Sequence, residues 1–420
     1  MRNNPIVFIL VFSAIILAID SYAYWGVRKL TGTYGRKLRR AIWILFWIVP
    51  FVLISGLVLF VALPINPSDY LGYFHLISGT FILFYVPKLV FVLVNILDDL
   101  ILLLRKLYFK IRERNREDLP KGEPISRAQF LTRTGLILAA VPFFSIAYGI
   151  TWGRFNYTVR KHSLKFPTLP RSFDGLRIVQ ISDFHIGSFG GYPEEVERIV
   201  AAINDQHADL LVFTGDFVNN VSSEMDAFLP ALRGLNATIG KYSILGNHDY
   251  GEYVPWRSPE EKQQNLQRLI TLQEDLGFRV LLNDAHTLDL NGEKLDLVGV
   301  ENWGLRPFPQ YGDLNKALSR AQPDSFKVLM SHDPTHWDEQ VLGRTGIDLT
   351  LSGHTHGAQF GIEIPGWRWS PVNIRYKRWG GLYEEPNQKL HVNTGLGFIG
   401  FPGRVGMPPE ITVIELKRSV

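Results

Sequence analysis

The sequence has 420 residues, no Cys, and a formal net charge of +4 that is unevenly distributed. Residues 1–160 hold 19 Lys and Arg against 8 Asp and Glu, so the rest of the chain carries a net charge of −7. An acidic C-terminal part argues against nucleic-acid binding, which depends on Lys and Arg neutralising phosphates, and the absence of Cys excludes disulfides, thiolate metal ligands and a cysteine nucleophile.

Four apolar segments predict membrane-spanning helices, each of which needs about 20 mainly apolar residues. The segments are residues 6–24, 41–63, 73–94 and 135–152. Lys88 lies within the third, and we expect it either to reach the membrane interface or to face the helix bundle, because a charge among lipid chains is costly. We therefore interpret residues 1–156 as a transmembrane region.

The distribution of Lys and Arg between these segments predicts the orientation of the chain. Six basic residues lie at positions 28–40 and seven at positions 105–121, whereas residues 64–72 contain none. Because cytoplasmic loops retain Lys and Arg, four crossings place the remainder of the chain outside the cytoplasm. If the fourth segment lies in the interface instead, the domain that follows is cytoplasmic.

The pattern changes after the apolar segments. Residues 157–172 are polar and contain two prolines, which favours a linker. From residue 173 to residue 420, short runs rich in Val, Ile and Leu end in turn residues and alternate with helix-like segments such as residues 193–206. This alternation predicts an α/β domain with covered sheets, in which ligands gather beyond the carboxyl ends of the strands.

Side chains that bind divalent cations follow these predicted strands. Carboxylates, neutral imidazoles and amide oxygens are such ligands, and a shared carboxylate can bridge two cations. They are Asp183 and His185 in DFH, Asp216 in TGD, Asn247 in GNHD, His332 in SHD, and His354 and His356 in GHTH. We expect them to form a two-metal site with Asp216 as the bridge.

These blocks, in this order, resemble the pattern D-x-H, G-D, G-N-H-[DE], H and G-H-x-H of the calcineurin-like metallophosphoesterase family. The resemblance covers residues 173–418 and implies an αββα sandwich with two divalent metal ions, either Mn, Fe or Zn. It assigns one metal to Asp183, His185, Asp216 and His356, and the other to Asp216, Asn247, His332 and His354. It also implies that His248 stabilises the transition state or protonates the leaving group, and we expect Asp249 to orient the His248 ring.

The segment NTGLGFIGFPGRVGMPPEITVIEL resembles the C-terminal segment of bacterial membrane-associated phosphodiesterases of this family. Arg404 within it is a candidate substrate-binding residue, because a guanidinium can bind a phosphate through two N–H groups. Arg306, in the insert WGLRPFPQYGDL, is a second candidate. This insert and the run GWRWSPVNIRYKRW are predicted either to form an apolar rim at the membrane surface or to pack on the transmembrane helices.

These features predict a membrane-anchored phosphodiesterase or pyrophosphatase. Its substrate is expected to be a phosphorylated small molecule or a lipid, for example of the UDP-diacylglucosamine type, and not a nucleic acid. Two alternatives remain open: a broad-specificity phosphomonoesterase outside the cytoplasm, and a sensor or transport protein with a regulatory phosphoesterase-like domain.

Overall fold

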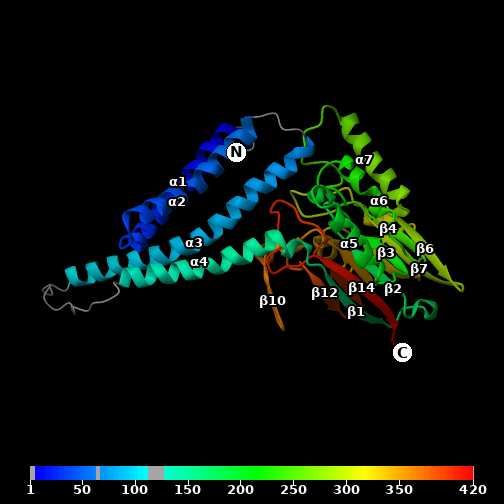
Figure 1. Cartoon of the computed structure of the whole chain (residues 1–420). Coiled ribbons are helices and arrows are strands. Elements are labelled where there is room, and N and C mark those ends of the chain that lie inside the picture. Colours follow the sequence, from blue (N-terminus) through cyan, green and yellow to red (C-terminus); the bar gives the residue numbers. More distant parts are fainter. Residues whose placement is uncertain (1–4, 63–66, 112–126, 420) are drawn as a thin grey trace. The chain divides into compact units, whose positions relative to one another are not determined.

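The computed structural model describes residues 5–62, 67–111 and 127–419. The chain divides into two compact units, Met1–Tyr148 and Gly149–Val420 (Figure 1). Residues 63–66 and 112–126, which belong to two of the loops used to predict the orientation, lie outside the described residues.

Long apolar helices occupy the predicted membrane-spanning positions. They are α1 (Pro5–Thr31), α2 (Arg36–Ala62), α3 (Pro67–Ile111) and α4 (Arg127–Thr151). Each is long and apolar enough to cross a membrane. Large side chains such as Ile6, Phe51 and Phe144 are 66%, 71% and 69% exposed, as expected of a surface that faces lipid. The chain is therefore a membrane protein, as predicted.

A buried ion pair joins α1 to α3 in the first unit. Lys88 Nζ donates to Asp20 Oδ1, Tyr85 Oη donates to Asp20 Oδ2, and Asp20 is fully buried. Lys88 thus takes the interior position of the two that we expected. Pairing the two charges reduces the cost of placing either of them among lipid chains.

The second unit is built on two six-stranded sheets. In spatial order they are β1 (Thr158–Phe166), β14 (Glu410–Arg418), β2 (Arg177–Ile181), β3 (Leu210–Phe213), β4 (Gly240–Ser243) and β5 (Phe278–Val280), and β12 (Gly381–Glu385), β13 (Gln388–Val392), β9 (Leu349–Ser352), β8 (Phe326–Met330), β7 (Glu293–Gly299) and β6 (Asp284–Leu290). The run from β2 to β5 is parallel, as is the run from β13 to β7. The carboxyl ends of each run therefore meet at one edge of its sheet.

Neighbouring side chains of the strands pack into different layers. Val179 lies in an apolar core with residues of α5 (Pro193–Asn204), α6 (Leu229–Leu232) and α7 (Pro259–Asp275). Ile178, the preceding residue, packs in a second core that contains side chains of both sheets. A third core joins the outer face of the second sheet to α8 (Leu314–Leu318). The layers are helix, sheet, sheet and helix, which confirms the predicted αββα sandwich.

The segment that we interpreted as a linker contains a strand instead. Thr158–Phe166 form β1, which pairs in parallel with β14 along its whole length. Leu164 and Phe166 are buried in the core between the sheets, whereas Lys161 and Lys165 are exposed. Because β1 is an edge strand whose exposed positions carry charges, its composition resembles that of a linker. The boundaries of the two domains otherwise stay a prediction.

Candidate metal centre

The predicted ligands lie where parallel strands of both sheets end. From the first sheet, Asp183 and His185 follow β2, Asp216 follows β3 and Asn247 follows β4; from the second, His332 follows β8, and His354 and His356 follow β9. The two sheets therefore bring all seven side chains together from five separate blocks of sequence. This convergence is what the positions after the predicted strands led us to expect.

Three of these side chains form a first group. Asp183, His185 and His356 are all buried, and their potential ligand atoms lie within 4.8 Å of one another. His356 Nε2 is 3.1 Å from His185 Nε2 and 3.3 Å from Asp183 Oδ1. Two imidazole nitrogens this close need a proton or a cation between them, because their lone pairs repel each other.

The second group contains Asp216, His332 and His354. His332 Nε2 lies 3.2 Å from Asn247 Oδ1, from His354 Nδ1 and from Asp216 Oδ2. Asp216 Oδ2 is also 3.6 Å from His185 Nε2 of the first group. One carboxylate oxygen therefore lies between the two groups, at the position that a bridging ligand takes.

The donor set fits two divalent cations. Imidazole nitrogens, carboxylates and one amide oxygen suit Mn, Fe or Zn. Burial lowers the pKa of His332, but the Asp216 carboxylate outweighs this effect, and the pKa rises to about 10. The imidazole is consequently protonated at neutral pH in the absence of metal, and a cation would replace that proton.

Strained backbone conformations turn the ligands towards one another. Five of the seven have a φ of 45° to 73°, in the left-handed region that costs a non-glycine residue roughly 1–3 kcal/mol. They are Asp183, His185, Asp216, His354 and His356. Glycines of the same motifs leave the necessary space: a Cβ on Gly246 would lie 2.2 Å from Asp216 Oδ1, and one on Gly353 would lie 2.3 Å from Asp183 Oδ2.

His248 lies beside the ligands, and a backbone carbonyl orients its ring. Its Nδ1 donates to the Asn219 carbonyl oxygen at 2.7 Å, which leaves Nε2 without a proton in the neutral ring. Burial lowers the pKa of His248, so the ring is neutral at pH 7 without metal. Sequence reasoning missed Asn219, because a backbone carbonyl leaves no residue signature.

Asp249 does not orient His248, contrary to our expectation. Its carboxylate accepts four backbone N–H groups instead. They belong to Asp216 at 2.8 Å, Gly246 at 2.9 Å, Phe217 at 2.8 Å and Val218 at 3.3 Å. Asp249 thus ties the loop after β3 to the loop after β4, and it fixes the backbone of the residue that lies between the two metal groups.

A pocket of about 250 Å³ opens onto these side chains. Besides predicted site residues it is lined by five residues that we had not expected there: Phe308, Thr355, Arg375, Tyr376 and Ile399. Arg375 is the one Lys or Arg residue among the described residues that line the pocket. Its guanidinium lies 5.0 Å from the Phe308 ring centroid. An exposed cation held over an aromatic ring is well placed to meet a phosphate.

Side chains outside the ligand set position His354. Its Nε2 lies 2.8 Å from Tyr376 Oη and 3.5 Å from Asp333 Oδ2, so Nδ1 is the nitrogen that faces the other ligands. Similarly, Asn247 Nδ2 donates to Tyr253 Oη at 2.7 Å, which turns Oδ1 towards His332. Such outer contacts fix the orientation of metal ligands.

Arg404 is not placed to bind phosphate as predicted. It is 1% exposed, and its guanidinium donates to the carbonyl oxygens of Thr394 at 2.8 Å, Gly395 at 3.1 Å and Gly397 at 2.9 Å. One of its nitrogens also lies 3.2 Å from His356 Nδ1. This buried guanidinium therefore holds the backbone of residues 394–397 next to His356, on the side of that ring opposite Nε2.

Arg306 is exposed and does not line the pocket. Only its backbone is connected to the site, since its carbonyl oxygen accepts a hydrogen bond from Arg375 at 3.4 Å. The basic residue at the pocket is therefore Arg375 rather than Arg306. Arg375 belongs to the aromatic and basic run that we had expected either to form a rim at the membrane surface or to pack on the transmembrane helices.

Two family models match the chain. Residues 1–154 match a model described as probable calcineurin-like phosphoesterase, transmembrane domain, and residues 176–358 match the calcineurin-like phosphoesterase model. Families of this kind use divalent metals, in agreement with the two groups of ligands. The identity of the metal is left open by both observations.

Relatives share this similarity over about three fifths of the chain. The chain is 34% identical to the uncharacterized metallophosphoesterase YkuE of Bacillus subtilis, over 62% of this chain and 85% of that protein. It is 29% identical to a transmembrane protein with metallophosphoesterase domain from Danio rerio, over 60% of this chain and 55% of that protein. It is 30% identical to the UDP-2,3-diacylglucosamine pyrophosphatase LpxG of Chlamydia muridarum, over 59% of this chain and 86% of that protein. With its ligand geometry and membrane helices, the chain belongs to the calcineurin-like metallophosphoesterase family, as a membrane-anchored, metal-dependent phosphoester hydrolase.

Proposed function

We propose that the chain is a two-metal phosphodiesterase or pyrophosphatase. One cation is held by Asp183, His185, Asp216 and His356, and the other by Asp216, Asn247, His332 and His354. The observation that carries the proposal is the position of Asp216 Oδ2, at 3.6 Å from His185 Nε2 and 3.2 Å from His332 Nε2. A single carboxylate oxygen this close to both groups supports a shared ligand.

The chain's own residues have distinct roles in this proposal. Bound divalent cations supply activation of water and stabilisation of charge on the phosphoryl oxygens. His248 stabilises the transition state or protonates the leaving group when its ring carries a second proton, at Nε2, and the Asn219 carbonyl holds the ring for that task through Nδ1–H. Arg375 binds the phosphate at the mouth of the pocket, while Asp249 and Arg404 hold the loops that carry the ligands.

The proposed substrate is lipid-linked, with a phosphodiester or pyrophosphate bond. Support comes from the membrane helices and from a relative named as a UDP-2,3-diacylglucosamine pyrophosphatase. The basic residues at positions 28–40 favour an extracytoplasmic second unit. Reporter fusions after Arg116 and after Val420 test on which side of the membrane the second unit lies. The proposal predicts that the fusion after Arg116 is cytoplasmic and that the fusion after Val420 is extracytoplasmic. If both fusions are cytoplasmic, the extracytoplasmic location is wrong and a nucleotide-sugar lipid in the cytoplasmic leaflet is favoured as substrate.

The reaction is tested with the full chain purified in detergent and supplied with Mn²⁺. We expect hydrolysis of bis-p-nitrophenyl phosphate, which requires diesterase activity, and its loss in EDTA. His248→Ala should retain its metal while turnover falls by about 10²- to 10⁴-fold, whereas His207→Asn, at an exposed position, should behave as the unaltered protein. Turnover of p-nitrophenyl phosphate without turnover of the diester would favour the phosphomonoesterase alternative.

A further inference from the structure

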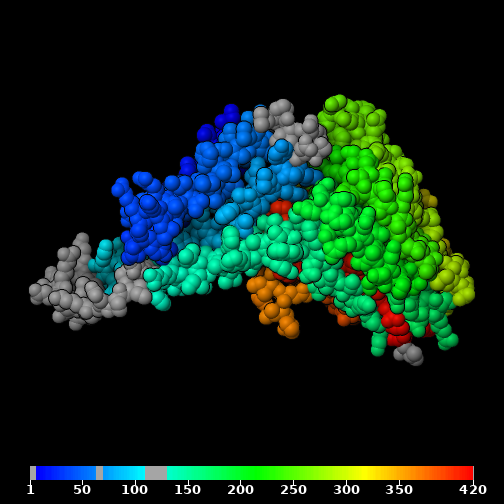
Figure 2. Space-filling model, viewed as in Figure 1, coloured from blue at the N-terminus to red at the C-terminus, as the bar shows by residue number. Residues whose placement is uncertain are grey.

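A short hairpin of the second unit belongs to neither large sheet. It consists of β10 (Ile362–Ile364) and β11 (Trp367–Trp369), which pair antiparallel. In Figure 1 the β10 ribbon extends away from β12 and β1, and in Figure 2 the same segment, in orange, projects from the surface. The hairpin is thus a separate projection of the folded domain.

One face of this hairpin is apolar and exposed. Ile362 pairs with Trp369, and Ile364 pairs with Trp367, so these four side chains share one face. They are 52%, 43%, 54% and 53% exposed, and nearby Ile374 is 90% exposed. Two tryptophans and two isoleucines on one exposed face, followed five residues later by the exposed Ile374, are unusual for a surface in contact only with water.

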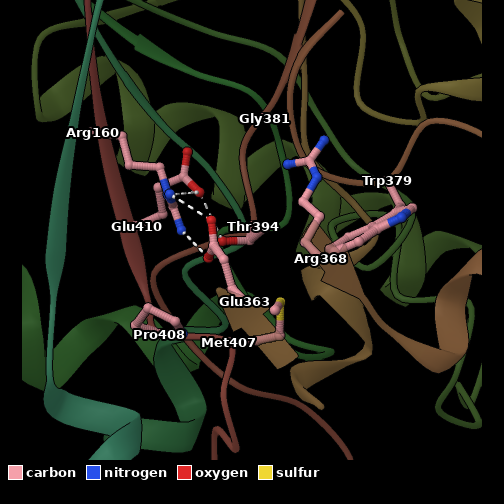
Figure 3. A pocket seen from close by; sticks show the side chains of 9 residues that line it. All are labelled: Arg160, Glu363, Arg368, Trp379, Gly381, Thr394, Met407, Pro408 and Glu410. Atoms are coloured by element: carbon pink, nitrogen blue, oxygen red, sulfur yellow. Dashed lines mark hydrogen bonds and ion pairs between the residues drawn. The ribbon is translucent and has the colours of Figure 1, made fainter. Parts of the chain in front are cut away.

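The opposite face of the hairpin is polar and held by the body of the domain (Figure 3). Arg160 of β1 donates to both oxygens of Glu363, at 3.0 Å and 2.6 Å, and its Nε lies 3.3 Å from Glu410 Oε2. The Arg368 guanidinium lies 5.0 Å from the Trp379 ring centroid. These contacts fix the hairpin with its apolar face directed away from the sheets.

The chain itself limits how far this hairpin can be from a membrane. Arg160 follows Thr151, the last residue of a membrane-spanning helix, by only nine residues. Nine residues extend at most about 30 Å, so the base of the hairpin stays near the bilayer surface. Tryptophan prefers that region, and the exposed cations Arg375 and Lys377 suit anionic lipid headgroups.

We propose that the outer face of the β10–β11 hairpin, together with Ile374, enters the interfacial region of a lipid bilayer. Ile374 directly precedes Arg375 and Tyr376, which line the pocket. The same contact therefore presents the metal centre to a phosphate located at the headgroup level. This second step rests on the proposed function, whereas the contact with lipid does not.

The contact is tested by fluorescence quenching on the full chain in anionic liposomes. Because the chain has no Cys, Trp367→Cys and Ile374→Cys each provide a single labelling site, and Glu274→Cys on the exposed surface of α7 is the control. We expect nitroxide lipids to quench the labels at 367 and 374 several-fold more than the label at 274. Equal lipid quenching at all three positions, with full access to aqueous iodide, overturns the proposal. Shielding of position 367 from both quenchers also overturns it, in favour of packing on protein.

A second measurement separates this contact from the proposed substrate. Replacement of Ile362, Ile364, Trp367 and Trp369 by Ser should leave kcat/KM for soluble bis-p-nitrophenyl phosphate unchanged. It should lower hydrolysis of a lipid-linked pyrophosphate in liposomes by about tenfold or more. Equal hydrolysis of the lipid by both proteins contradicts a productive contact. If the unaltered protein ignores the lipid but its labels are quenched, the lipid-substrate proposal fails and the contact stands.

Discussion

Replacing Asp249 by Asn tests the role that the structure gives this residue. Each carboxylate oxygen accepts two backbone N–H groups. An Asn side chain of the same shape keeps one accepting oxygen, so its NH₂ group faces two N–H donors whichever way the amide is turned. A buried donor left without an acceptor costs about 1–3 kcal/mol. Asp249→Asn should therefore destabilise the second unit by about 2–6 kcal/mol, and it should also displace Asp216.

The assay is thermal unfolding of the full chain in detergent, with Mn²⁺ content measured on the same samples. Burial and the Asp216 carboxylate raise the pKa of Asp249 to about 7, so the comparison is made at pH 8, where the carboxylate is ionised. Asp275→Asn, at an exposed position of α7, is the matched control. A variant that loses less than about 1 kcal/mol and keeps its full metal content would show that the four hydrogen bonds do not hold the centre.

Three further predictions concern residues around the ligands. Tyr376→Phe removes the hydroxyl 2.8 Å from His354 Nε2 and should weaken Mn²⁺ binding by about 10- to 100-fold; an unchanged binding isotherm would contradict this role. Arg404→Met leaves three carbonyl oxygens of the buried cluster without their donor, and should lower the melting temperature and the metal content together, whereas lost activity at full metal content and stability would instead indicate substrate binding. Burial lowers the pKa of His336 from 6.5 to about 4. The stability that this neutral imidazole gives the folded state is therefore full above pH 6.5 and falls by at most about 3 kcal/mol as the pH drops towards 4. In EDTA, His336→Gln should be destabilised less by acid than the unaltered protein, and an identical pH profile would show that His336 does not cause this acid sensitivity.

The side chains of the two candidate metal groups were predictable because their signal is local. Each is an Asp, His or Asn residue, a type that binds divalent cations, and it lies shortly after a run of apolar residues, as in LRIVQISDFH and ADLLVFTGD. The alternation of such runs with helix-like segments predicted an α/β domain with covered sheets, since strands covered on both faces are apolar throughout, and the family resemblance implied the sandwich. The buried residues Ile178 and Val179 illustrate this, because consecutive positions serve two different cores.

The contacts around the ligands were not predictable, because they join segments distant in sequence. Arg404 looked like a phosphate-binding residue from composition, yet it packs behind His356, 48 positions earlier. Asp249 looked like a partner of its neighbour His248, but its oxygens point to the loop after β3. Arg375 and Tyr376 enter the pocket only because the chain that follows the hairpin returns to the metal centre.

The strand β1 was missed for a different reason. Its pairing partner in space, β14, is about 250 residues further along the sequence, so the sequence around residues 158–166 contains no sign of this pairing. Only Leu164 and Phe166 are buried, and an edge strand needs few apolar positions. Local composition therefore cannot distinguish such a strand from a polar linker.

The number of Mn²⁺ ions that the active full chain binds tests the two-metal centre most directly. Metal is removed with EDTA, Mn²⁺ is added back in steps, and bound metal and hydrolysis of bis-p-nitrophenyl phosphate are measured on each sample. The shared position of Asp216 predicts saturation at two ions per chain, with turnover that becomes maximal only when both are bound. Maximal turnover with one ion per chain, or full turnover after EDTA, would contradict it.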